Sequence, residues 1–186
     1  YTGEVQVEGV DLNFLVNGCS RRAVLANLTR VRAGSPAPPP DLVHVARRVF
    51  HNFALNIVDF IRLPLVDLES MRRLIRIEGW EHLAHAHAQG RGVIILTAHI
   101  GNWEWAGVLF AQSGFKVKAV VLEHGAGRVT RFFARRRQEK GLEVLPLTGS
   151  TSAMLAWLRQ GGVVGLVADR DFAGQGISVT FFGEMA

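Results

Sequence analysis

The chain has 186 residues, of which 48% are hydrophobic and 20% are charged, a composition typical of a packed globular protein that excludes general disorder. Its single cysteine, Cys19, excludes an intramolecular disulfide and the paired cysteines of common zinc and redox sites. The 21 Lys and Arg residues against 16 Asp and Glu give a formal net charge of +5, which favours polyanionic partners such as nucleic acid, anionic lipid or phosphorylated substrates.

No apolar run approaches the roughly 20 residues that a membrane-spanning helix needs. The start at Tyr1 and the end just after an apolar segment predict that the sequence is a fragment of a longer chain. We predict a single domain over residues 1–186. It comprises an N-terminal extension with a proline-rich linker (1–40) and an α/β core (41–186).

The first elements are an extended segment and a short helix. Residues 4–16 alternate apolar and polar in two registers that change at Gly9, which predicts an extended segment with a bulge or turn. A turn signal at Asn17 precedes a short helix over residues 20–32. The four prolines of residues 34–40 then exclude regular structure, because proline has no amide donor and a fixed φ.

Three helices are predicted next. From Asp41, a good N-cap, apolar residues recur at helical spacing as far as Ile61, and Pro64 ends this long helix. Two shorter helices are predicted over residues 67–77 and 78–89. The N-terminal region is therefore helical.

The second half alternates short apolar runs with helical segments. The runs carry apolar residues on both parities, which indicates strands buried on both faces. We therefore predict an α/β fold with a mostly parallel central sheet flanked by helices, in which ligands lie beyond the carboxyl ends of the strands. The predicted strands are 93–96, 117–121, 142–145 and 163–167, and the helices between them are 103–113, 128–140 and 150–159.

A histidine and a carboxylate follow the first predicted strand. On one continuous helix His99 and Glu104 would lie about 140° apart. If the strand ends near Thr97, Gly101 allows a bend and a helix begins around Asn102, their side chains can converge. A carboxylate on one imidazole nitrogen fixes the tautomer and makes the ring a better base. The alternative is a partly buried histidine beside a glutamate that complements the helix dipole.

The sequence offers no protein nucleophile to accompany this base. It contains no GxSxG motif, and Cys19 lies far from His99. His99 would therefore activate a hydroxyl of the substrate, as in a transferase, or water, as in a hydrolase. A third possibility is a non-enzymatic basic module that binds anionic lipid or nucleic acid, although recognisable RNP, zinc-finger and helix-turn-helix signals are absent.

Residues 99–104, HIGNWE, resemble the HxxxxE/D motif of the bacterial lipid A biosynthesis acyltransferases, the lauroyl and myristoyl transferases of the lysophospholipid acyltransferase-like superfamily. The resemblance runs from about Asn27 to the end. The segment 168–171 is also similar to that of the phosphatidylinositol mannoside acyltransferases, which usually have Asp in place of Glu104. We therefore expect the lipid A branch, with the mannoside enzymes as the alternative. The further segments that carry the likeness are 27–28, 50–53, 168–172 and 181–183.

The resemblance implies transfer of a fatty acyl group from acyl carrier protein or coenzyme A to a hydroxyl of a membrane glycolipid such as a lipid A precursor. We expect no further cofactor, no metal and no nucleic acid partner. The expected location is the cytoplasmic face of the bacterial inner membrane, with peripheral contact to its anionic surface.

The same resemblance assigns residue roles. His99 would be the general base on the acceptor hydroxyl and Glu104 its orienting partner. An arginine of the following helix would suit a phosphate group, because its guanidinium can bind oxygens bidentately. The implied substrate-binding residues are Asn102, Arg136, Asp169 and Asp171.

Two other groups of side chains have ordinary explanations. The histidines of residues 82–87 do not predict a metal site, because their spacing does not place all three on one helical face. Trp103, Trp105 and Phe110 could line an acyl groove, although aromatic residues on an amphipathic helix are more typical of a core.

Overall fold

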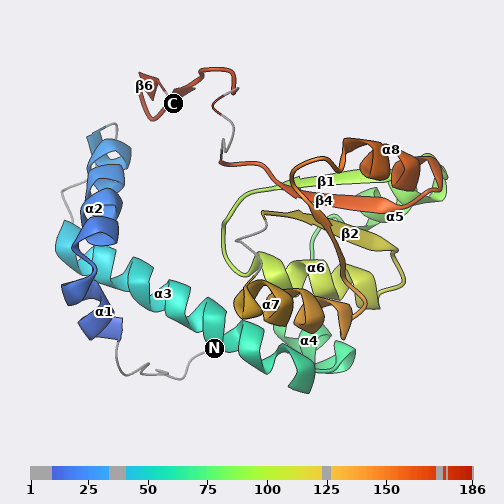
Figure 1. Ribbon diagram of the computed structural model, residues 1–186, viewed down its shortest axis with the longest axis horizontal. Helices are drawn as coiled ribbons and strands as arrows, with labels where there is room; N and C mark the ends of the chain where they lie inside the picture. Colours follow the sequence, from blue (N-terminus) through green and yellow to red (C-terminus); the bar gives the residue numbers. More distant parts are fainter. Residues whose placement is uncertain (1–9, 34–40, 123–126, 171–173, 175, 186) are drawn as a thin grey trace. The chain divides into compact units, whose positions relative to one another are not determined.

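The computed structural model describes residues 10–33, 41–122, 127–170, 174 and 176–185 (Figure 1). The chain divides into two compact units, one formed by residues 1–59 with 172–186 and the other by residues 60–171. The domain boundary near residue 40 stays a prediction. None of the described helices combines the length and apolar character that crossing a bilayer requires.

The first unit begins with a helix where an extended segment is predicted. α1 covers Val10–Val16, while residues 4–9 lie outside the described residues. Phe14 is buried and packs edge-on against Phe50, with ring centroids 5.3 Å apart. The Arg21 guanidinium donates to the carbonyls of Phe14 and Leu15, which satisfies the C-terminal end of α1. The extended prediction is therefore wrong for these residues.

The remaining helices of this region start and stop where local signals place them. α2 covers Gly18–Ala33 and α3 covers Leu42–Arg62. The Asp41 carboxylate caps α3 by accepting from the amide of Val43 at 2.9 Å. α3 ends just before the 3-10 turn η1, Leu63–Leu65, whose proline cannot donate to a continuing helix.

The C-terminal residues of the first unit form a small hairpin. β5 (Thr180–Phe181) and β6 (Glu184–Met185) pair antiparallel. Glu184 accepts from Arg30 of α2 at 2.8 Å, so an ion pair joins the hairpin to the helix.

The second unit contains a parallel sheet, which confirms the predicted α/β fold. Its strand order is β1-β4-β2-β3, and every pair is parallel. The strands are β1 (Val93–Thr97), β2 (Val117–Val121), β3 (Glu143–Pro146) and β4 (Val163–Val167). The helices are α4 (Leu68–Leu74), α5 (Trp80–Ala88), α6 (Trp103–Gln112), α7 (Arg128–Gln138) and α8 (Thr151–Arg159).

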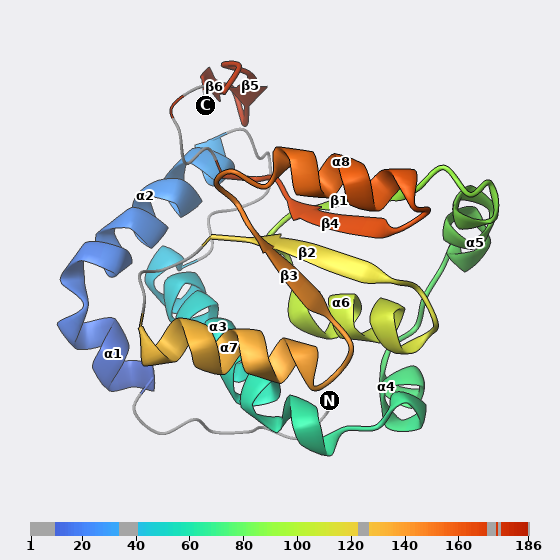
Figure 2. The same cartoon turned by 45° about the vertical axis from the view of Figure 1, so that its right-hand side comes forward.

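Helices cover both faces of the sheet. α6 and α7 lie on one face and α8 on the other (Figure 2). The crossover from β2 to β3 leads outward to the edge strand of the sheet, whereas the next crossover, from β3 to β4, leads back across β2 in the opposite direction. A right-handed connection must then place α8 on the opposite face.

The core of this unit lies between the sheet and the α6 face. Val108 and Leu109 of α6 are buried against Val163 of β4, together with Phe60 and Met71. Each fully buried aliphatic or aromatic side chain contributes roughly 1.5–3 kcal/mol. The core therefore holds the strands in a fixed register, and this register positions the candidate site.

Candidate active site

The pairing of β1 with β4 brings His99 and Asp169 together. Thr97 lies opposite Val167 in the parallel register, and the ladder continues with a bond from the Ala168 amide to the Thr97 carbonyl at 2.9 Å. His99 and Asp169 each follow their strand by two residues. They therefore occupy matching positions at the carboxyl edge, by which we mean the edge of the sheet where the strands end.

Two hydrogen bonds join these residues. His99 Nδ1 lies 2.7 Å from Asp169 Oδ1, and the His99 backbone amide donates to Asp169 Oδ2 at 2.9 Å. Both carboxylate oxygens are thus used to hold one residue. The side chains are 34% and 37% exposed, so a ligand can reach the ring.

The ionisation of Asp169 determines which ring nitrogen can act as a base. Partial burial would raise the pKa of this carboxyl, but the bonds from the backbone and ring of His99 outweigh it and hold the pKa below its usual range. An ionised carboxylate only accepts hydrogen bonds, so Nδ1 carries the proton. Nε2 is then the acceptor of the neutral ring, and nothing within the described residues bonds to it.

The turn into α6 fixes the other side of the imidazole. Gly101 has φ +61°, a conformation that glycine adopts readily, and it provides the predicted bend. The Asn102 side chain caps α6 by accepting from the Trp105 amide at 3.1 Å. Trp103 then packs edge-on against His99, with centroids 4.8 Å apart. The substrate-binding role of Asn102 stays a prediction.

The predicted convergence of His99 with Glu104 is wrong. Asp169 already occupies Nδ1, and Glu104 points from the first turn of α6 towards α7. There its two carboxylate oxygens accept from Nε and Nη2 of Arg137, the first at 2.8 Å. The two carboxylates of this region therefore have separate partners.

Arg137 is the arginine that contacts the motif, one residue after the predicted Arg136. Its side chain is 13% exposed and that of Glu104 17%. Its guanidinium lies 5.5 Å from the centre of the Phe60 ring, which places the ion pair against the core. Arg136 instead pairs with Glu139, at 3.4 Å. A substrate-binding role for Arg136 stays a prediction, and Asp171 lies outside the described residues.

Comparisons with known proteins identify the family. Residues 11–186 match the model of the bacterial lipid A biosynthesis acyltransferases. The chain belongs to this family.

The curated relatives carry a more specific name. The chain is 32% identical over 162 residues to the phosphatidylinositol mannoside acyltransferase of Mycolicibacterium smegmatis, covering 85% of this chain and 53% of that protein. It is 32% identical over 164 residues to the protein of the same name from Mycobacterium tuberculosis, covering 85% and 51%. The chain thus spans about half the length of the curated relatives it matches.

In this member of the acyltransferase family, the motif residues 99–104 lie on two structural elements with different partners. His99 belongs to the carboxyl edge and to Asp169, whereas Glu104 belongs to the α6–α7 interface and to Arg137. Only the first of these pairs presents a proton acceptor to solvent.

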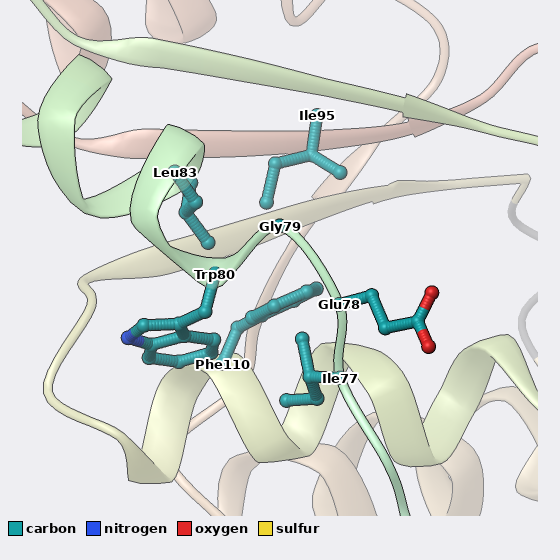
Figure 3. Close-up of a pocket in the computed structure, with 7 residues that line it drawn as sticks. All are labelled: Ile77, Glu78, Gly79, Trp80, Leu83, Ile95 and Phe110. Carbon is teal, nitrogen blue, oxygen red and sulfur yellow. The ribbon is translucent and has the colours of Figure 1, made fainter.

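The aromatic residues that the sequence suggested for an acyl groove lie in different surroundings. Trp105 is buried in the core, whereas Phe110 lines a small apolar hollow beside α5, stacked on Trp80 (Figure 3). The only titratable group of its lining is Glu78, which pairs with Arg76. The hollow therefore lacks the groups of an active site. Its lining is Ile77, Glu78, Gly79, Trp80, Leu83, Ile95 and Phe110.

The predicted histidine cluster has a packing partner. The His87 ring lies edge-on to Phe115, with centroids 5.0 Å apart. In the part of the chain that the structure describes, no three His, Cys, Asp or Glu side chains gather as metal ligands would.

Proposed function

We propose that this chain carries the active site of an acyltransferase that moves a fatty acyl group from a thioester to a hydroxyl of a glycolipid. The observation that supports this most directly is the His99–Asp169 pair. It presents a positioned, solvent-accessible imidazole at the edge of the sheet where α/β proteins bind ligands.

The reaction needs one proton acceptor and no protein nucleophile. Nε2 of His99 takes the proton of the acceptor hydroxyl as its oxygen attacks the thioester carbonyl carbon. The C–S bond of the resulting tetrahedral intermediate breaks, and the imidazolium returns the proton to the departing thiolate. Asp169 stays ionised throughout and stabilises the imidazolium. We assign stabilisation of the oxyanion to backbone amides or an arginine.

The family and the curated relatives support a glycolipid acceptor. The description of the family names lipid A biosynthesis, and the names of the relatives contain phosphatidylinositol mannoside. The names of the relatives favour a mannosylated phosphoinositide, while Glu104 at the end of the motif favours the lipid A branch. We propose acyl carrier protein or coenzyme A as the acyl carrier, no further cofactor, and peripheral action at the cytoplasmic face of the inner membrane.

The test uses the intact protein with labelled acyl-CoA and acyl carrier protein thioesters. Each donor is combined with a phosphatidylinositol mannoside and with a lipid A precursor, and products are identified by mass spectrometry. We expect one acceptor to gain an ester, and His99→Ala to lower the rate by about 10²–10⁴-fold. Full activity in a folded His99→Ala protein would refute the mechanism, and consumption of donor without acylated acceptor would indicate a hydrolase.

A further inference from the structure

α7 is a basic helix with no counterbalancing acid of its own. All of its charged residues are arginines. Their surroundings differ, because Arg137 is partly buried with Glu104, while Arg135 and Arg136 share Glu139, just beyond the helix. The arginines of α7 are Arg128, Arg131, Arg135, Arg136 and Arg137.

The N-terminal half of α7 combines exposed charge with exposed apolar side chains. Arg128 is exposed and forms no ion pair with any described residue. Val129 is 67% exposed, and Phe132, three residues later on the same side of the helix, is also exposed. Arginine beside exposed aliphatic and aromatic residues is typical of helices that lie in the interface of an anionic membrane.

This half of the helix lies at the same edge of the sheet as the His99–Asp169 pair. β2 ends at Val121 and α7 begins at Arg128, so the helix starts at the carboxyl edge and runs away from it (Figure 2). Ile100, next to His99, is 80% exposed at this edge. A surface that contacts the start of α7 would therefore face the candidate site.

We propose that the docking face, formed by Arg128, Val129 and Phe132, binds an anionic lipid surface and presents membrane glycolipids to His99. The functional part of this inference rests on the proposed acyl transfer, whereas the lipid contact does not. The positive charge complements anionic headgroups, and the apolar side chains can enter the boundary between headgroups and acyl chains. A polyanion such as nucleic acid would use the charge but would offer no apolar layer to Val129 and Phe132.

The test measures flotation of the intact protein with phosphatidylcholine vesicles that contain or lack phosphatidylglycerol, at low and high salt. We expect binding only to the anionic vesicles, weakened by salt. The double variant Arg128→Glu/Val129→Ser should weaken vesicle binding about tenfold or more. It replaces a positive charge that anionic headgroups attract with a negative charge that they repel, and it removes an apolar side chain.

A matched control variant lies on the opposite face of the sheet. Leu155 and Arg159 of α8 are likewise an exposed apolar residue and an exposed arginine, and Leu155→Ser/Arg159→Glu makes the same chemical changes. The control should bind vesicles like the unmodified protein. The proposal would be overturned if both variants bound vesicles equally well or lost binding equally. It would also be overturned if the docking-face variant bound an acidic carrier protein more weakly but bound anionic vesicles as before.

Activity assays distinguish a failure of this inference from a failure of the proposed function. With a short-chain, water-soluble acceptor, Arg128→Glu/Val129→Ser should retain the transfer rate of the unmodified protein, because neither residue belongs to the His99–Asp169 pair. With acceptor embedded in anionic vesicles, its rate should fall with its binding. Vesicle binding without any transfer would contradict the acyltransferase and leave the lipid contact standing.

Discussion

At the scale of single residues, Asp169 determines which nitrogen of His99 can take a proton. Its two oxygens hold the ring through Nδ1 and the backbone through the amide, so that Nε2 faces outward as the acceptor. Both contacts are stronger when the carboxylate is ionised. The acidity of Asp169 is therefore linked to stability as well as to the proposed role of His99 as a base.

This linkage gives a pH-dependent prediction. The pKa of Asp169 is lower in the folded protein than its usual 3.8, so its ionised form stabilises the fold fully above that value. The contribution is lost as the pH falls through the folded pKa. Urea unfolding at several pH values should show Asp169→Asn less stable than the unmodified protein at neutral pH, with the gap closing in acid. A gap that widens on acidification would contradict the assignment.

Glu104 and Arg137 give a second prediction, and it revises one made from the sequence. If Glu104 were the orienting partner of His99, as the family resemblance implies, Glu104→Ala would abolish transfer and leave the fold intact. The structure instead pairs Glu104 with Arg137, whose side chain is 13% exposed, and removing one partner of a fully buried ion pair costs about 3–5 kcal/mol, which sets an upper bound here. We expect Glu104→Ala and Arg137→Ala to lower the free energy of unfolding by up to that amount, measured by urea denaturation.

A double-mutant cycle checks this pair. Glu104→Ala/Arg137→Ala should cost less than the sum of the single changes, because no unpaired charge is left behind. Strict additivity would mean that the two side chains do not stabilise one another.

At the scale of elements, the loop between α5 and β1 makes a close approach to α8. Gly92 has φ +78°, and a Cβ there would lie 2.4 Å from the Leu158 carbonyl oxygen. Gly90 has a similar φ of +70° but no atom within 4 Å of such a Cβ. Both positions have a backbone conformation that is unfavourable for a residue with a side chain, but only Gly92 also lacks room for a Cβ atom.

Alanine at these two glycines separates the two effects. Gly90→Ala should cost about 1–2 kcal/mol, the penalty of a left-handed backbone for a residue with a Cβ. Gly92→Ala should cost clearly more, because α8 must also move. Thermal unfolding of the two variants measures the difference, and equal costs would mean that the approach to α8 is not tight.

Most element boundaries could be predicted, and α1 shows why one could not. Asp41, Pro64 and the apolar runs are local signals, and the structure follows them. The alternation in residues 10–16 predicts an extended segment, yet these residues form a helix in which Phe14 is buried while Val16 is 72% exposed. The packing of Phe14 on α3 determines the conformation here, and this contact cannot be read from a local pattern.

At the scale of the whole molecule, the order of strands in the sheet determines which residues meet at the candidate site. The sequence predicts parallel strands and a site at their carboxyl ends, but it does not state which strands are neighbours. β4 lies beside β1, so Asp169 reaches His99 across 70 positions of sequence, whereas Glu104, five positions away, turns to α7. Asp169 was predicted as a substrate-binding residue, and its pairing with the ring appears only in three dimensions.

We propose that Asp169, and not Glu104, is the partner of His99 in the acyl transfer. The most direct measurement compares kcat/KM for acyl transfer in Asp169→Asn and Glu104→Gln, two near-isosteric changes, in the intact and folded protein. We predict a loss of about 10²–10⁴-fold for Asp169→Asn and less than about tenfold for Glu104→Gln, which can still accept from Arg137. An unimpaired Asp169→Asn protein beside an inactive, folded Glu104→Gln protein would contradict the account.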